Sequence, residues 1–266
     1  MIGDFHLHSN RSDGRLSPPA LIDVVADAGV QVAALTDHDT TAGVQEAASR
    51  ARERGLTFLP GIEMTTFGFE RVVHVLGLGI DPEHTDLHKA NRVASAVWDA
   101  NQRRWIEAIG KNKVKVSVDR DFADHPVRLP VLIERLCLRG FADGDPKQAH
   151  AAFRKFFDGL PADAYAALPT PAQAAAIIRC AGGVAIVAHP YGLLQDQLME
   201  RLLGDVDGAE ALYVPYTDAQ RADLRAVIER NGKLISCGSD YHGYFTAEYR
   251  RPLWDAPDAL VQRLQV

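Results

Sequence analysis

Apolar runs and amphipathic stretches alternate along most of the chain. The short apolar runs predict buried strands over 2–8, 30–35, 56–62, 72–78, 183–188, 208–214 and 233–238. Stretches with apolar residues at helical spacing predict helices over 18–28, 42–54, 171–181, 193–203 and 217–231. This order of strands and helices is typical of a parallel α/β architecture.

The alternation is interrupted between residues 83 and 168. Three segments in this stretch have the composition of helices: 86–110, 128–139 and 146–158. We interpret 83–168 as an inserted helical subdomain, so that 1–82 and 169–266 together form one α/β domain.

Composition and charge narrow the possible partners. The 266 residues are 47% hydrophobic and 24% charged, which is typical of a folded globular protein. The net charge of −6 argues against a broad basic surface for duplex DNA. Three scattered cysteines predict neither disulfides nor a thiolate metal site, and they favour a reducing, cytoplasmic setting. The sequence shows neither a signal peptide nor a membrane span, and nothing in it indicates an obligate protein partner.

Imidazoles and carboxylates gather at the predicted strand ends. Functional groups of parallel α/β barrels collect at the carboxyl ends of the strands, so residues far apart in sequence should meet at one mouth. The candidates are His6, His8, Asp13, Asp37, His38, Asp39, Glu63, His74, His189, Asp240 and His242. The other four histidines lie in the insertion without ligand spacing and are interpreted as surface or interface residues.

Two pairs carry the strongest signal. His6 and His8 are two residues apart on a predicted strand, so both imidazoles face the same side and can reach one ion. Asp240 and His242 repeat this spacing after the last strand. An isolated His-x-His more often marks two solvent-facing side chains, but the other strand ends here supply further ligand types. His189, which ends an apolar strand before a proline, is one of them.

The remaining candidates are weaker one by one. His38 lies between Asp37 and Asp39 after a buried strand, and burying such charges without partners is costly. We expect His38 to be a ligand and at least one of the two aspartates to cap the following helix. Glu63 is a candidate to bridge two metals. His74 lies inside an apolar strand, where a histidine is more often a hydrogen-bonded core residue.

The types of ligand atom in these candidates indicate which metals and which reaction the site would support. Imidazole and carboxylate without thiolate suit Mn²⁺, Fe²⁺ or Zn²⁺. Several neighbouring ions would share a hydroxide, because metals lower the pKa of bound water towards ~7, and they would hold the oxygens of an in-line displacement. The sequence therefore predicts a metal-dependent hydrolytic site.

Taken together, the motifs resemble those of the PHP (polymerase and histidinol phosphatase) family. They are His6-Leu7-His8, Ser12-Asp13-Gly14, Thr36-Asp37-His38-Asp39, Gly61-Ile62-Glu63, His74, His189-Pro190 and Ser239-Asp240-Tyr241-His242. The resemblance spans the chain outside the insertion. It implies a distorted (β/α)7 barrel with three divalent ions, Mn²⁺ being the first expectation.

The resemblance also implies how the ligands are shared. One ion would be held by His6, His8, Glu63 and Asp240. A second would share Glu63 and add His74 and His189. The third would be held by Asp13, His38 and His242. Asp240 and His242 are also candidates for proton transfer. Together with the bridging candidate Glu63 they form the expected catalytic group.

Within the family, the chain is similar to small bacterial enzymes that act on nucleotides. This likeness implies removal of the 3′-phosphate from a nucleoside 3′,5′-bisphosphate such as adenosine 3′,5′-bisphosphate. The alternatives are a 5′→3′ exoribonuclease on short RNA, a histidinol-phosphate phosphatase, and a metal-binding regulatory module without catalysis. The acidic charge favours a small substrate over long RNA. The regulatory module is disfavoured because no ligand position is substituted.

Arginines of the insertion are candidates for binding a second phosphate. Related sequences often have Arg-Pro-His where this chain has Arg128-Leu129-Pro130, so the arginine is kept and the histidine is absent. Arginine binds phosphate bidentately and stays charged. We expect Arg104, Arg128 and Arg135 to bind this phosphate, with Arg103 in reserve. The insertion that carries them is expected to cover the end of the barrel that binds metal. A solvated helix face is the alternative for each of them.

Overall fold

The computed structural model describes residues 1–110, 129–243, 249–252 and 254–266. The chain divides into two compact units, which are described separately. The first comprises Met1–Asn91 and Pro169–Val266, and the second comprises Arg92–Leu168. Across the described residues, every helix is too short or too polar to traverse a bilayer.

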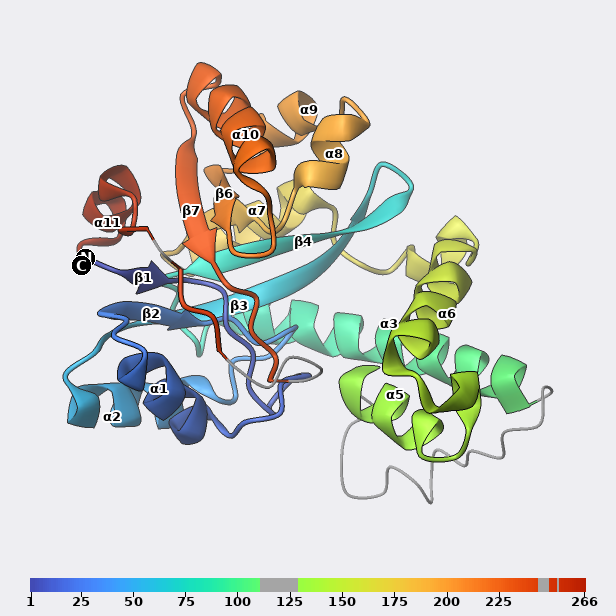
Figure 1. The fold of residues 1–266 in the computed structure, drawn as a ribbon. Coiled ribbons are helices and arrows are strands. Elements are labelled where there is room, and N and C mark those ends of the chain that lie inside the picture. Colours follow the sequence, from blue (N-terminus) through green and yellow to red (C-terminus); the bar gives the residue numbers. More distant parts are fainter. Residues whose placement is uncertain (111–128, 244–248, 253) are drawn as a thin grey trace. The chain divides into compact units, whose positions relative to one another are not determined.

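A seven-stranded sheet forms the centre of the first unit, and its strands are neighbours in chain order (Figure 1). They are β1 (Gly3–Asp4), β2 (Val32–Leu35), β3 (Thr57–Gly68), β4 (Arg71–Leu78), β5 (Val184–Val187), β6 (Gly208–Tyr213) and β7 (Leu234–Gly238). The backbone N–H of Phe5 donates to the carbonyl of Cys237, and Leu7 forms a parallel bridge with Tyr241. These contacts bring the two edges together, so the sheet is a nearly closed barrel. The predicted distorted (β/α)7 barrel is thereby confirmed.

One strand departs from the expected parallel order. β4 is antiparallel to both β3 and β5. Only Phe69 and Glu70 separate β3 from β4, and both have positive φ, 54° and 58°. Such a two-residue turn makes a hairpin and leaves no room for the crossover that a parallel pair requires. As a result β3 continues to Gly68, and Glu63 lies within a strand instead of at its end.

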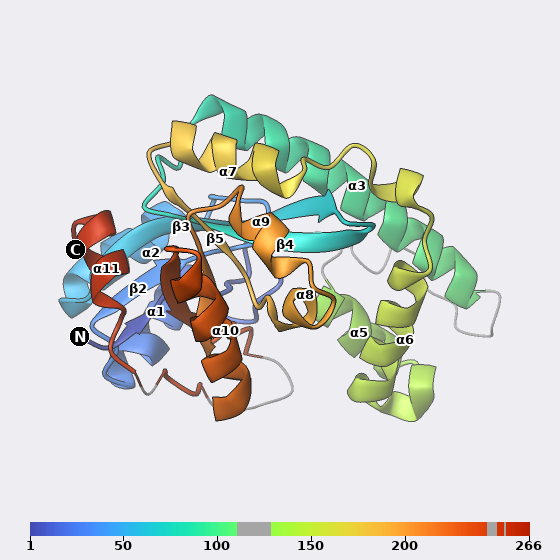
Figure 2. The same cartoon turned by 90° about the horizontal axis from the view of Figure 1, so that it is seen from above.

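Helices cover the outside of the barrel. They are α1 (Pro18–Asp27), α2 (Val44–Arg54), α7 (Pro171–Cys180), α8 (Tyr191–Gln195), α9 (Met199–Leu203), α10 (Asp218–Arg230) and α11 (Asp258–Leu264). α7 packs on β4 and β5 (Figure 2). The single helix expected over 193–203 is instead two short helices, because Gln197 between them has a φ of 59°. α11 was not among the predicted helices.

Alternate strand residues supply the core. Side chains of one strand face fill the barrel with a cluster that includes Leu59, Leu76 and Ile186. Side chains of the other face, such as Val75 and Val187, pack beneath the helices. Because the interior is filled by apolar groups, the polar side chains are confined to one end of the barrel.

The second unit is helical. It contains the part of α3 (Thr85–Gly110) from Arg92 onward, α5 (Leu129–Cys137), α6 (Pro146–Asp158) and two 3₁₀ helices, Phe141–Gly144 and Ala162–Tyr165. Trp105, Phe153 and Phe157 form an aromatic core, in which Trp105 meets Phe153 edge to face at 4.9 Å. The unit therefore has a hydrophobic core of its own.

Candidate metal centre

Side chains from six of the seven strands meet at one end of the barrel. His6 and His8 follow β1, and Asp13 lies in the loop beyond them. His38 follows β2, Glu63 lies in β3 and His74 in β4. His189 follows β5, and Asp240 and His242 follow β7. The antiparallel course of β4 explains His74: it pairs with Thr65, which places an early residue of β4 at the edge where the parallel strands end. The structure thus brings together all nine expected ligands, whose role in binding metal remains a prediction.

Glu63 lies at the centre of this cluster. Its side chain is fully buried, with Oε2 facing three imidazoles and Oε1 facing two others. Oε2 is 3.0 Å from His6 Nε2, 3.1 Å from His8 Nε2 and 3.3 Å from His38 Nδ1. Oε1 is 3.1 Å from His74 Nδ1 and 3.4 Å from His189 Nε2. A carboxylate whose two oxygens face different imidazoles has the geometry of a bridging ligand.

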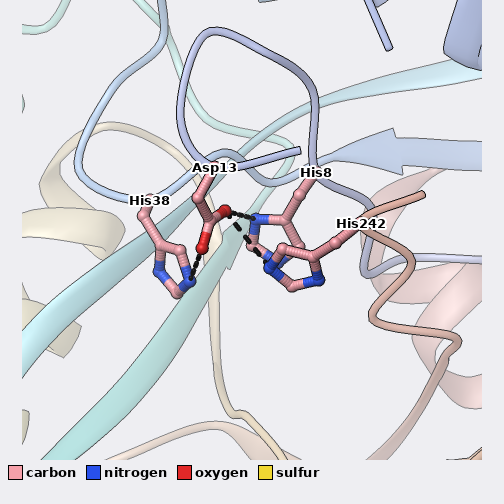
Figure 3. Close-up of side chains that lie close together, drawn as sticks. All are labelled: His8, Asp13, His38 and His242. Carbon is pink, nitrogen blue, oxygen red and sulfur yellow. Dashed lines mark ion pairs between the residues drawn. The ribbon is translucent and has the colours of Figure 1, made fainter. Parts of the chain in front are cut away.

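Among the described residues, three sets of donor atoms are compact enough to hold an ion, each with its atoms within 4.8 Å of one another. The sets are His6, His8, Glu63 and Asp240; His8, Asp13, His38 and His242; and His38, Glu63 and His74. In the second set the Asp13 carboxylate lies among three imidazoles, 3.2 Å from His242 Nε2 and 3.5 Å from His8 Nδ1 (Figure 3). The sets share members, so ions bound to them would be close neighbours.

Unsatisfied atoms in the cluster fit a divalent metal. Among the described residues, both ring nitrogens of His8 and His74, Nδ1 of His38 and Oε1 of Glu63 are buried without a hydrogen-bond partner. Each such atom costs roughly 1–3 kcal/mol when left unpaired. Imidazole nitrogen and carboxylate oxygen are donors that Mn²⁺, Fe²⁺ and Zn²⁺ accept. Metal coordination would satisfy these atoms together.

The carboxylates make the cluster attractive to positive charge. Burial lowers the pKa of His8, but the neighbouring carboxylates of Asp240, Glu63 and Asp13 outweigh it and raise the pKa to about 10. The pKa of His6 is also raised, because Glu210, Glu63 and Asp240 together outweigh burial.

His38 behaves in the opposite way. Burial dominates, and the neighbouring His8 and His74 add to it, so its pKa falls to about 3 despite the attraction of Glu63 and Asp13. His38 is therefore neutral at pH 7, the form in which imidazole binds a metal.

These shifts predict that metal loading releases protons. His6 and His8 have raised pKa values, so both hold a proton at pH 7 that an incoming ion must displace. Metal affinity should therefore rise with pH from 6 to 8. Calorimetric titration of chelator-treated protein with Mn²⁺ in two buffers of different ionisation enthalpy would count the protons. Equal heats in the two buffers would contradict the prediction.

The helix-capping role expected for Asp37 or Asp39 is wrong. α2 begins after Gly43 and has no side-chain cap. Asp37 instead accepts hydrogen bonds from the N–H and Oγ of Ser9, at 2.7 and 2.6 Å. Asp39 accepts from the N–H and Oγ1 of Thr65, at 2.8 and 2.6 Å. These carboxylates accept hydrogen bonds from the loop after β1 and from β3, which a local sequence pattern does not reveal.

Sequence reasoning also missed two residues of β6. Glu210 is fully buried and hydrogen-bonds His6 and His189. The hydroxyl of Tyr213 donates to Asp240 Oδ2 at 2.7 Å, which leaves Asp240 Oδ1 facing His6 and His8. The sequence did contain a signal for Glu210, because it is a single glutamate inside an otherwise apolar strand. Burying a lone charge requires a partner.

The arginine candidates lie in the second unit. Arg103 and Arg104 are exposed on α3, and Arg135 is half-buried on α5. Arg104 Nη1 donates to Asn101 Oδ1 of the same helix at 3.1 Å. Arg128 lies outside the described residues. The binding of phosphate by these arginines remains a prediction.

A seven-stranded barrel with an imidazole–carboxylate cluster at one end is the framework of a metal-dependent phosphoesterase, and that is the class of this protein. Residues 4–121 match the PHP domain. The chain belongs to the PHP family.

Known proteins resemble the chain over nearly its whole length. A 3′,5′-nucleoside bisphosphate phosphatase of Chromobacterium violaceum is 33% identical, covering 90% of this chain and 86% of that protein. A phosphoribosyl 1,2-cyclic phosphate 1,2-diphosphodiesterase of Eggerthella lenta is 30% identical, with coverages of 92% and 95%. A 5′-3′ exoribonuclease of Haemophilus influenzae is 29% identical, with coverages of 90% and 89%. These relatives share phosphoester hydrolysis and differ in the ester.

A solved structure supports the same class. A protein of Bifidobacterium adolescentis, described as a metal-dependent phosphoesterase, superposes with a TM-score of 0.83 at 25% identity. The match covers 98% of this chain and 94% of that one.

Proposed function

We propose that the protein removes the 3′-phosphate from nucleoside 3′,5′-bisphosphates. The observation that carries this proposal is the 33% identity, over 90% of the chain, to a 3′,5′-nucleoside bisphosphate phosphatase. The acidic net charge supports it, because a small substrate does not need the broad basic surface that long RNA requires.

The nine clustered side chains would hold three divalent ions, with Mn²⁺ as the first candidate. The compact donor sets support this number, since there are three of them. When bound, the ions supply Lewis-acid charge and activate water for in-line attack on phosphorus. Glu63 would join two of the ions, because each of its oxygens faces different imidazoles.

The protein's own groups would orient the reacting phosphate and handle its protons. The carbonyl of Asp240 can only accept a hydrogen bond, so His242 Nδ1, 2.9 Å away, carries the ring proton. His242 Nε2 is thereby left as the lone-pair nitrogen, 3.2 Å from Asp13. We assign to Asp240 or His242 the transfer of a proton from the attacking water to the leaving oxygen, and both side chains are partly exposed.

The second phosphate of the substrate would be bound by arginines of the helical unit. Holding a remote phosphate orients the reacting one, so its loss should lower kcat/KM. Arg104 and Arg135 are the first candidates among the described residues, with Arg103 in reserve, because a guanidinium binds phosphate through two parallel hydrogen bonds.

Substrate selectivity tests the proposal. The 3′,5′-bisphosphate should react about tenfold to a hundredfold faster in kcat/KM than the 3′-monophosphate, since a charge-assisted contact contributes roughly 1.5–3 kcal/mol. Arg104→Ala and Arg135→Ala should remove most of this ratio without changing metal content. Arg154→Ala changes an exposed arginine of the same unit and serves as the matched control.

The same assay should include 5′-phosphorylated short RNA, a 1,2-cyclic phosphodiester of phosphoribose and histidinol phosphate. A higher kcat/KM on any of these than on adenosine 3′,5′-bisphosphate would contradict the proposed substrate. Equal rates on the bisphosphate and the 3′-monophosphate would show that no arginine binds a second phosphate.

A further inference from the structure

Glu210 lies directly behind the metal centre. It is in β6, the one strand that contributes none of the nine clustered side chains, and it is fully buried. Its neighbours along the same strand face, such as Leu212, belong to the apolar barrel interior. A carboxylate in such surroundings needs strong hydrogen-bond donors.

Each oxygen of Glu210 has one such donor. Oε1 lies 3.0 Å from His6 Nδ1, and Oε2 accepts the backbone N–H of His189 at 2.7 Å. One carboxylate thus joins two residues that come from separate strands and that both contact Glu63.

The contact with His6 selects a tautomer. A carboxylate oxygen accepts a hydrogen bond, so the proton of the neutral ring belongs on Nδ1. The Nε2 lone pair then faces Glu63 Oε2 at 3.0 Å and Asp240 Oδ1 at 3.3 Å. Three electron-rich atoms so close together need a shared cation, which is a proton in the metal-free protein and a metal ion in the loaded one.

The hydrogen bond from the His189 N–H to Glu210 fixes an unusual backbone conformation at His189. His189 has a φ of +33° and precedes Pro190, a position that disfavours helical conformations. Its N–H is fixed by Glu210, and its ring stacks on that of His6 with centroids 5.8 Å apart. The space around the contact is also constrained: a Cβ at Gly238 would lie 2.5 Å from Glu210 Oε1 and 2.4 Å from the Cβ of His6.

We infer that Glu210 is a positioning residue of the metal centre, which fixes His6 as an Nε2 donor and holds His189 in place. Outer carboxylates act in this way at many metal sites, where they set the tautomer and orientation of a ligating histidine. The inference concerns metal binding and does not depend on which phosphate ester is the substrate.

Glu210→Gln tests the inference with little change of shape. The amide oxygen would accept from the His189 N–H, and the NH₂ group would then face His6 Nδ1. Nδ1 would have to accept, which moves the ring proton to Nε2, where Glu63 and Asp240 can receive it. The variant should fold but bind Mn²⁺ about 10–100-fold more weakly at the position that includes His6. Competition with a chelator, together with a count of bound ions, would measure the loss.

Asp207→Asn is the matched control. Asp207 immediately precedes β6, and its carboxylate bonds Arg179 and the Ala185 N–H. This variant should keep the Mn²⁺ affinity of the unaltered protein. A folded Glu210→Gln protein with unchanged affinity and ion count would overturn the inference.

A measurement on the unaltered protein tests the inference even if the Glu210→Gln variant fails to fold. In the Zn²⁺-loaded protein, long-range ¹H–¹⁵N spectra should show the proton of His6 on Nδ1. An unprotonated Nδ1 would overturn the inference without any variant.

Discussion

Replacement of Glu63 by glutamine is expected to lower phosphoester hydrolysis by at least about 10²–10³-fold, the scale on which loss of one preorganised charged or polar group acts. Glu63 lies within 3.4 Å of ring nitrogens of five histidines. Glutamine keeps the shape but offers one acceptor where the carboxylate offers two, and it carries no charge to balance the ions. Metal content, measured by mass spectrometry, should therefore fall together with kcat/KM.

Glu70→Gln is the matched control, because Glu70 is exposed at the turn of the same hairpin. It should keep both activity and metal. If Glu63→Gln retained its full complement of metal and its activity, the central role assigned to Glu63 would be wrong. Circular dichroism of both variants would separate loss of metal from loss of fold.

Removal of divalent metal is expected to have the second large effect, a fall in kcat/KM of about 10³-fold or more that Mn²⁺ reverses. Metal ions contribute several kcal/mol to transition-state stabilisation, and each 1.36 kcal/mol is a factor of ten in rate. The nucleophilic groups of Ser9, Ser12 and Cys237 are poorly placed to replace them. The hydroxyls of Ser9 and Ser12 donate to Asp37, and the buried thiol of Cys237 faces the carbonyl of Gly3.

The test is hydrolysis before and after dialysis against a chelator, with Mn²⁺, Fe²⁺ and Zn²⁺ restored separately. Mg²⁺ serves as a control, because it prefers oxygen ligands to imidazole. A single turnover in ¹⁸O-water should place label in the released phosphate. Full activity of metal-free protein would point to a protein nucleophile, and unlabelled phosphate would point to attack at carbon instead of phosphorus.

Much of the fold could be predicted because buried strands leave a strong pattern. Val32–Leu35 and Val184–Val187 are uniformly apolar, and each was recognised to within two residues at either end. The course of β4 was missed. The turn at Phe69 and Glu70 lacks the Asn-Gly type of sequence that announces a two-residue hairpin, so an antiparallel pair could not be distinguished from a parallel one.

The candidate site, like the fold, could be predicted from the sequence only in part. His6 and His8 could be grouped from sequence because side chains two apart on a strand share a face. Asp37 and Asp39 were misassigned because their donors, Ser9 and Thr65, lie 28 and 26 residues away along the chain. Short-range rules such as helix capping consider only a few neighbouring residues, so they do not identify partners that are distant in sequence.

The sequence by itself determined the donor types, their strand positions and the class of chemistry, because these depend on residue identity and on the two-residue period of a strand. Only the tertiary structure decided which atoms face one another. It placed Glu63 among five imidazoles and put Glu210 and Tyr213 behind the ligands. Their partners come from other strands, up to 204 residues distant, and closure of the barrel alone brings them into contact.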